Sequence, residues 1–183
     1  MLPERFVIGG LSLGAIVAMA LAVQEPDRVA GLILVSTNAR APTDAQRAGW
    51  RSWEARLDGG ETPRDLQASI LGALLSPDAL AGRPDVVART LRMGSETEER
   101  MLRAQLRLQA TRTDLRPGLG RVEAPALIVS GESDTICPPS FHADIAAHLP
   151  SARLVTLDGG HLLPLEQPAA FGDLVAGWLA RQS

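Results

Sequence analysis

A serine lies between two glycines near the amino end of the chain, in the segment Gly10–Gly14 with the sequence GLSLG. The apolar run Arg5–Ile8 before it favours a buried strand, and the run Ala15–Ala22 after it is rich in good helix formers. A serine in such a strand-to-helix turn holds its hydroxyl off the edge of a sheet, and glycines leave room for the strained backbone. We therefore predict that Ser12 is a nucleophile.

A carboxylate and an imidazole that could activate this serine follow later in the chain. Asp134 comes after the apolar run Ala126–Ser130, and His161 comes after the run Arg153–Leu157. In an open parallel sheet the loops after the strands gather at one edge, so Ser12, Asp134 and His161 are expected to meet there. The imidazole would take the hydroxyl proton, and the carboxylate would hold the imidazole in the correct tautomer.

Each of these residues also fits a purely structural role. A serine between glycines can be a turn residue, Asp134 a turn or cap residue, and His161 a solvated loop residue. His142 and His148 lie in a predicted helix, follow no strand, and are expected at the surface. Cys137 is expected to be a small buried thiol rather than a nucleophile.

The chain order serine, aspartate, histidine is the order found in α/β-hydrolases. The sequence resembles the carboxyl-terminal two thirds of an α/β-hydrolase of the esterase and lactonase type. It is similar in particular to 3-oxoadipate enol-lactonase-like proteins and to esterases acting on methyl esters of acyl carrier protein. The matching segments are Phe6–Ala22, Asp27–Val35, Ala126–Pro138 and Gly159–Pro168.

This resemblance implies a serine hydrolase that cleaves a carboxylic ester, lactone or thioester through an acyl-enzyme on Ser12. Asp134 and His161 fall on the acid and base positions, and the backbone N–H of Leu13 would be one donor to the oxyanion. Neither a metal nor an organic cofactor is required. Two alternatives stay open: a non-catalytic hydrolase-like module, and a perhydrolase or cofactor-free haloperoxidase that uses the same three residues.

The second oxyanion donor of this fold comes from a loop upstream of the nucleophile, and only Met1–Leu11 precede Ser12 here. We therefore expect the sequence to be an amino-terminally truncated fragment, with activity impaired by the loss. Without the strands that would come first, Phe6–Ile8 is expected to form an apolar sheet edge through which the chain could self-associate.

Strand-like runs alternate with helical patterns, which predicts a three-layer α/β-hydrolase core with a mostly parallel sheet whose first strands are missing. The core is expected in two parts, residues 1–38 and 113–183. Residues 39–112 carry helical signals only and are expected to form an inserted helical cap over the site. Helix starts are predicted at Thr43, Pro63, Pro84 and Ser95 in the cap, and at Ser140 and Pro168 in the core.

Side chains of the cap are candidates for the substrate pocket. Trp50, Trp53 and Met101 could line an acyl pocket, or could pack only in the core of the cap. Its arginines Arg100, Arg103 and Arg107 are expected to form a solvated face, with the holding of an acidic substrate as the alternative. The last predicted helix carries an apolar stripe that should pack on the sheet: Phe171, Leu174, Val175, Trp178 and Leu179.

Composition excludes several other classes of protein. The chain is 45% hydrophobic and 21% charged, with a formal net charge of −3, which gives no basic surface for nucleic acid. The apolar stretch from Phe6 to Val23 is interrupted by glycines, so a strand followed by a helix fits better than a membrane span. The amino end has no basic start with a cleavage site, and Cys137 is the only cysteine. We therefore expect a cytoplasmic protein without a disulfide.

Overall fold

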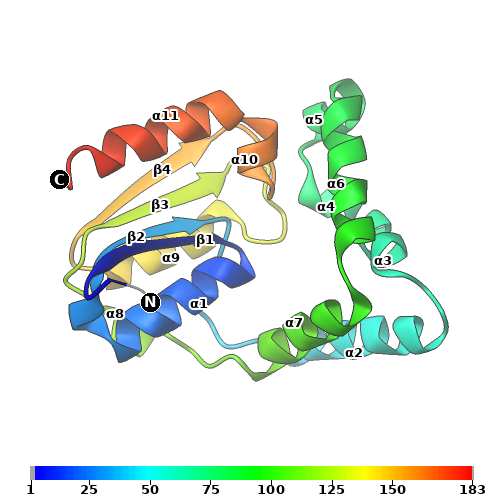
Figure 1. Cartoon of the computed structure of the whole chain (residues 1–183), viewed down its shortest axis with the longest axis horizontal. Coiled ribbons are helices and arrows are strands. Elements are labelled where there is room, and N and C mark those ends of the chain that lie inside the picture. Colours follow the sequence, from blue (N-terminus) through cyan, green and yellow to red (C-terminus); the bar gives the residue numbers. More distant parts are fainter. Residues whose placement is uncertain (1–2, 183) are drawn as a thin grey trace.

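The structure is a computed structural model that describes residues 3–182, so Met1, Leu2 and Ser183 lie outside it. Four parallel strands form one sheet in the order β1-β2-β3-β4 (Figure 1). The strands are β1 (Phe6–Leu11), β2 (Val29–Val35), β3 (Ala126–Gly131) and β4 (Ala152–Leu157). The predicted parallel α/β core is confirmed, and the loops after all four strands reach the same edge of the sheet.

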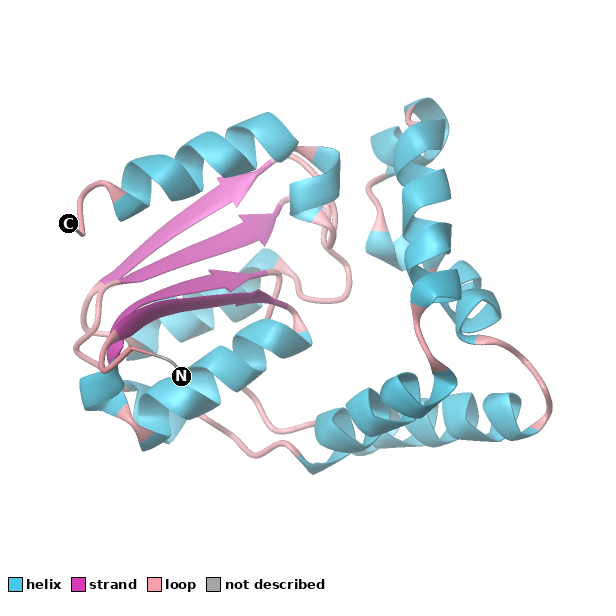
Figure 2. Ribbon diagram, viewed as in Figure 1, coloured by secondary structure: helices cyan, strands magenta, loops and turns pink. Residues whose placement is uncertain are grey.

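Helices cover both faces of the sheet and give the three layers seen in Figure 2. One face carries α1 (Leu13–Gln24), α8 (Arg116–Leu119) and α9 (Pro139–His148), with a 3-10 turn η1 (Pro26–Arg28) after α1. The other face carries α11 (Pro168–Leu179), which follows the short helix α10 (Leu163–Glu166). The predicted starts of α9 and α11 are therefore correct to within one residue.

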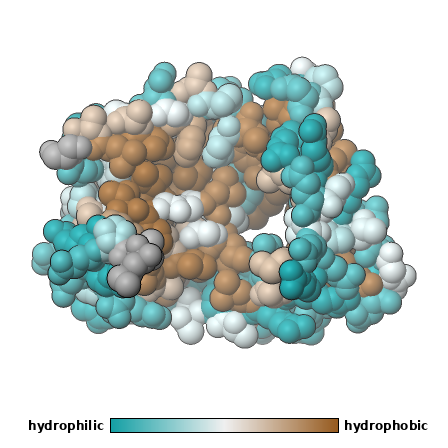
Figure 3. Space-filling model, in the orientation of Figure 1, coloured by the Kyte–Doolittle hydropathy of each residue, from teal (hydrophilic) through white to brown (hydrophobic). Residues whose placement is uncertain are grey.

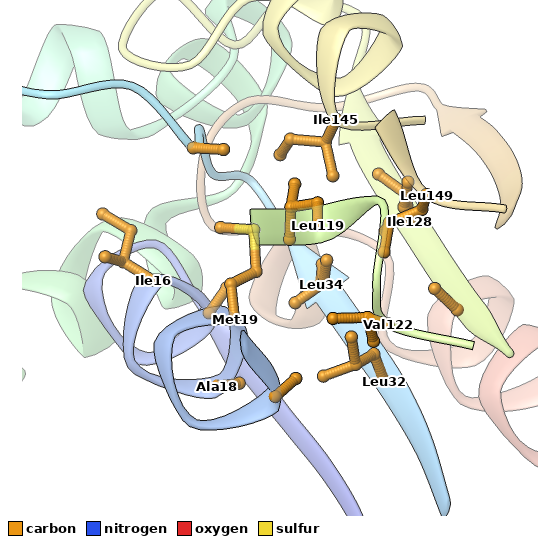
Figure 4. Close-up of a cluster of buried hydrophobic side chains, with 14 of the residues drawn as sticks. Ile16, Ala18, Met19, Leu32, Leu34, Leu119, Val122, Ile128, Ile145 and Leu149 are labelled. Carbon is orange, nitrogen blue, oxygen red and sulfur yellow. The ribbon is translucent and has the colours of Figure 1, made fainter. Parts of the chain in front are cut away.

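The larger core lies between the sheet and α1, α8 and α9, as Figure 4 shows. Met19, Leu34, Ile128 and Ile145 are fully buried there, and each such side chain contributes about 1.5–3 kcal/mol when it leaves water. All six residues of β3 are buried, as expected for an inner strand of a parallel sheet that is covered on both faces.

A smaller core lies under α11. Trp178 is buried there, and the partly buried Phe171, Leu174 and Val175 pack beside it. The predicted stripe therefore packs on the sheet except at its end, because Leu179 is 38% exposed.

Strand β1 pairs only with β2 among the described residues, so its other edge has no strand partner. Val7 on this strand is 37% exposed. Figure 3 shows apolar surface over this side of the molecule, between the helices on the two faces of the sheet.

Between β2 and β3 the chain forms an arm of helices, which we call the helical arm (residues 44–111). Its helices are α2 (Asp44–Asp58), α3 (Pro63–Ser69), α4 (Leu71–Leu74), α5 (Pro77–Gly82), α6 (Pro84–Glu96) and α7 (Glu99–Thr111). The capping box at Thr43 and the helix start at Pro84 are confirmed. No helix among residues 3–182 is both long and apolar enough to cross a membrane.

Two predictions within the helical arm were wrong. The hydroxyl of Ser95 donates to the carbonyl of Leu91 at 3.3 Å inside α6, so it does not cap the next helix. The single helix predicted from Pro63 is split at Ile70, where the hydroxyl of Ser69 donates to the carbonyl of Leu66 at 2.7 Å. In both cases a serine hydroxyl donates to a backbone carbonyl of the preceding turn. This local hydrogen bond competes with helix capping and with the regular helical conformation.

Candidate active site

Ser12 occupies the turn between β1 and α1 with φ of 53° and ψ of −115°. A positive φ is strained for a residue other than glycine and costs about 1–3 kcal/mol, so neighbouring contacts must hold it. The Ser12 N–H donates to the Val35 carbonyl at 2.9 Å. The Ser12 carbonyl accepts from the hydroxyl of Thr37 at 3.0 Å and from the N–H groups of Ala15 and Ile16 in α1, each at 3.1 Å. Contacts from the end of β2 therefore fix the turn that holds Ser12.

The first glycine of the GLSLG segment is required by close packing. A Cβ on Gly10 would lie 2.3 Å from the carbonyl carbon of Gly14 and 2.6 Å from the nitrogen of Ala15. A Cβ on Gly14 would have no such neighbour within 4 Å. The sharp reversal from β1 into α1 thus depends on Gly10 more than on Gly14.

Asp134 and His161 form a buried hydrogen-bonded pair. His161 Nδ1 lies 2.9 Å from Asp134 Oδ2, and both residues are at most 3% exposed. Asp134 Oδ1 accepts the N–H groups of Ile136 at 2.9 Å and Cys137 at 2.8 Å. With its hydrogen on Nδ1, the neutral imidazole donates to this carboxylate, and its Nε2 can then accept a proton.

The loops that carry Asp134 and His161 are packed backbone against backbone. A Cβ on Gly131 would lie 2.2 Å from the carbonyl oxygen of Gly160. The N–H of Ser133 donates to the carbonyl of Gly159 at 2.9 Å, and Gly159 itself has φ of 142°. These glycines bring the segment before Asp134 directly against the segment before His161.

Residues 158–166, which carry the predicted base His161 and are called the base loop below, are also bonded to the helical arm. The N–H groups of His161 and Leu162 both donate to the carbonyl of Leu74, at 3.0 and 3.2 Å. The buried carboxylate of Glu166 accepts the N–H of Gly160 at 3.0 Å and the N–H of Ser76 at 3.1 Å. Three hydrogen bonds thus join the arm to the base loop, and the bond from Gly160 to Glu166 holds the loop internally.

Ser12 and His161 line one cavity of about 770 Å³ between the sheet edge and the helical arm. Figure 3 shows the hollow between these two parts of the molecule. Trp50 and Trp53 line it, as one of the two predicted roles requires. Met101 was a wrong candidate for either role, because it is 50% exposed and does not line the cavity. The other lining residues from the arm are mostly apolar or carry amides.

His142 corrects another prediction. It is fully buried rather than at the surface, and its Nε2 accepts the N–H of Thr37 at 2.9 Å while its Nδ1 lies 3.3 Å from the carbonyl of Pro138. Burial lowers the pKa of His142, so the neutral ring is favoured. His148 is exposed as predicted. Cys137 is a buried thiol as predicted, and burial raises its pKa to about 12.

Of the predicted solvated face, Arg100 and Arg107 are exposed, whereas the side chain of Arg103 is only 22% exposed. Arg103 pairs with Asp58 and Glu99, Arg100 with Glu98, and Arg107 with Glu54. None of the three arginines lines the large cavity, so the alternative role in holding an acidic substrate has no support here.

Sequence reasoning missed Glu166 and Arg112. The signal for Glu166 was present, since it is the only charged side chain in the apolar stretch from Leu162 to Pro168. Arg112 lines a second cavity beside Ser12, and no local pattern marks it. No cluster of three or more metal-ligating side chains occurs within residues 3–182.

The family profile described as "alpha/beta hydrolase fold" matches residues 2–168 of the chain. The chain belongs to this family. Among curated alpha/beta hydrolase relatives, it is 33% identical over 180 residues to the pimeloyl-[acyl-carrier protein] methyl ester esterase of Nitrosomonas europaea, covering 93% of this chain and 69% of the relative. It is 25% identical over 179 residues to 3-oxoadipate enol-lactonase 2 of Acinetobacter baylyi, covering 94% of this chain and 62% of the relative.

Solved structures agree. A thermophilic esterase from Thermogutta terrifontis, determined with malate bound, superposes with a TM-score of 0.90 at 31% identity, over 98% of this chain and 66% of that one. The chain thus spans about two thirds of the length of the alpha/beta hydrolases that it matches. The resemblance to esterases and lactonases of this fold is confirmed.

Proposed function

We propose that this chain carries the nucleophile, acid and base of a serine hydrolase that cleaves a carboxylic ester, a lactone or a thioester. The observation that supports this best is the buried Asp134–His161 pair beside the cavity that Ser12 also lines. The names of two relatives, a methyl ester esterase and an enol-lactonase, point to the same reaction class.

In the proposed reaction His161 Nε2 takes the proton of the Ser12 hydroxyl as Oγ attacks the substrate carbonyl carbon. The bond from that carbon to the leaving oxygen or sulfur then breaks, and His161 returns the proton to the leaving group. Water then adds to the acyl carbon as His161 takes its proton; the bond from that carbon to Ser12 Oγ breaks, and His161 returns the proton to Oγ, which releases the acid and regenerates Ser12. Asp134 stabilises the imidazolium that forms in each step.

The backbone N–H of Leu13 is the proposed donor to the oxyanion. Leu13 is the first residue of α1, and the first N–H groups of a helix have no acceptor within the helix. These groups also lie at the positive end of the helix dipole. In this proposal the turn at Ser12 provides the nucleophile and one oxyanion donor together.

Residues 39–112 are proposed to act as a cap over this site. Trp50 and Trp53 on α2 give the cavity apolar walls, and the amides of Gln67 and Gln105 give it neutral polar groups. Such walls would bind an acyl chain and exclude water from the ester bond.

A fluorophosphonate probe tests the proposal, because it phosphonylates only an activated serine. We expect the probe to label Ser12 and expect the Ser12→Ala variant to be unlabelled. Hydrolysis of p-nitrophenyl butyrate should disappear in the same variant. A well-folded chain that takes no label and hydrolyses no ester, alone or extended upstream, would support the non-catalytic alternative.

A further inference from the structure

A second cavity of about 240 Å³ adjoins the large one, and Ser12, Trp50 and Gln109 line both. It extends past Ser12 toward Asn38 and Arg112. Among the described residues, no aspartate or glutamate side chain lines either cavity. Arg112 is therefore the one fully charged side chain among the described residues of these walls.

The guanidinium of Arg112 is held only by neutral groups. Its Nε donates to the carbonyl of Arg40 at 3.1 Å, its Nη2 donates to Gln46 Oε1 at 3.5 Å, and its Nη1 donates to Gln109 Oε1. It also lies over the ring of Trp50, 5.4 Å from the ring centre. These contacts fix the position of the group without neutralising its charge.

This environment differs from that of the ion-paired arginines of the helical arm. Arg103, for example, lies between the carboxylates of Asp58 and Glu99 at 2.9 and 2.7 Å. Within residues 3–182, no carboxylate lies at ion-pair distance from Arg112, and burial lowers its pKa. A guanidinium stays charged in proteins, so the uncompensated charge beside Ser12 favours an anion from outside the chain.

We propose that Arg112 binds a carboxylate of the substrate, so that the preferred substrates are esters that also carry a carboxylate. This inference rests on the proposed hydrolase function. The three contacts use one hydrogen on each nitrogen and leave one hydrogen on each terminal nitrogen. Two such hydrogens match the two oxygens of a carboxylate. The reacting ester carbonyl would then lie at Ser12, where the two cavities meet.

Binding can be measured without turnover in the Ser12→Ala variant by titration calorimetry. Monoethyl glutarate, which is anionic, should bind about 10- to 100-fold more tightly than neutral diethyl glutarate, as one charge-assisted bond pair allows. A second pair, 4-acetoxybutanoate and its methyl ester, places the carboxylate on the alcohol side. Tighter binding of the anionic ester should appear in at least one of these two pairs of esters.

The variants Arg112→Gln and Arg112→Lys then assign the preference to this residue. Arg112→Gln should remove it, and Arg112→Lys should keep part of it because the charge remains while the fork is lost. Arg51→Gln is the matched control, since Arg51 is exposed on α2 and lines neither cavity. Circular dichroism confirms that each variant is folded. Equal binding of anionic and neutral esters, or a preference that survives Arg112→Gln, would overturn the inference.

Hydrolysis separates this inference from the function on which it rests. In the chain with Ser12 intact, the ratio of kcat/KM for the anionic and neutral esters should fall about 10- to 100-fold in Arg112→Gln. If neither ester is hydrolysed but the binding preference depends on Arg112, the hydrolase proposal fails and the carboxylate site stands. If both esters are hydrolysed at rates that ignore Arg112, the hydrolase stands and the carboxylate site fails.

Discussion

The side chains of Asp134 and His161 meet at 2.9 Å, and the second oxygen of Asp134 is occupied as well, by two backbone N–H groups of its own loop. Both carboxylate oxygens of Asp134 therefore have hydrogen-bond partners. The pair is also enclosed, because both side chains are almost completely removed from solvent.

Replacing Asp134 by Asn should disable the site and leave the fold intact. An amide has one acceptor oxygen, so it either loses the N–H groups of Ile136 and Cys137 or presents its NH₂ to His161 and favours the wrong tautomer. By analogy with serine proteases, kcat should fall about 10⁴-fold. The measurement is p-nitrophenyl ester hydrolysis, with the exposed Asp158→Asn as the control. A loss of less than about tenfold would contradict the role given to Asp134.

The two glycines around Ser12 should respond differently to alanine. Gly10→Ala places a methyl group 2.3 Å from backbone, which should cost about 1–3 kcal/mol or more of the free energy of unfolding. Gly14→Ala meets nothing within 4 Å and lies in a helix, so it should be neutral or slightly stabilising. Urea unfolding of both variants checks this, and equal stability of the two would refute the packing argument.

Glu166→Gln tests whether the buried carboxylate positions the base loop. Two N–H groups, of Gly160 and Ser76, donate to its two oxygens, and a glutamine can accept only one of them. We expect a loss of about 1–3 kcal/mol in stability and a lower kcat. Hydrogen exchange should become faster at the amides of Gly160 and Ser76.

The exposed Glu123→Gln serves as the control for this charge change. A purely structural role would lower stability while kcat and the pH profile of kcat/KM stay at their original values. Unchanged exchange at both amides would show that the carboxylate does not hold the two segments together.

Stability should fall in mild acid because of His142. Burial keeps its pKa in the folded chain below the ordinary value, so the unfolded chain binds the proton first as the pH falls. The free energy of unfolding should therefore decrease below about pH 6.5, by at most about 1.4 kcal/mol per pH unit for this group, until the pH reaches the folded pKa. Urea midpoints between pH 7.5 and 5 measure the slope. His142→Gln should flatten it, whereas a slope identical to that of the original chain would exclude His142 as its source.

The parts of this structure that sequence could predict depend on local patterns. β3 is a continuous apolar run, α11 opens at Pro168, and the residues at positions 12, 134 and 161 each follow a strand. Parallel topology then brings the ends of strands to one edge without any knowledge of distant contacts.

The parts that sequence reasoning missed depend on contacts between distant segments. His142 is buried because it accepts the N–H of Thr37, 105 residues earlier in the chain. Arg112 owes its environment to residues on α2 and to Arg40, which no periodicity reveals. Ser95 has a capping sequence around it, yet its hydroxyl bonds within α6, since the alternatives differ by only a small local energy.

Leu74 connects the wall of the large cavity to the loop of His161. One atom of the arm accepts the N–H groups of both His161 and Leu162, while the side chain of Leu74 forms part of the wall that faces a ligand. A ligand that displaces Leu74 would therefore also displace the backbone of His161, the proposed base. Substrates that fit poorly would then react slowly even when they bind, because the displacement of Leu74 that admits them would also move His161 out of position.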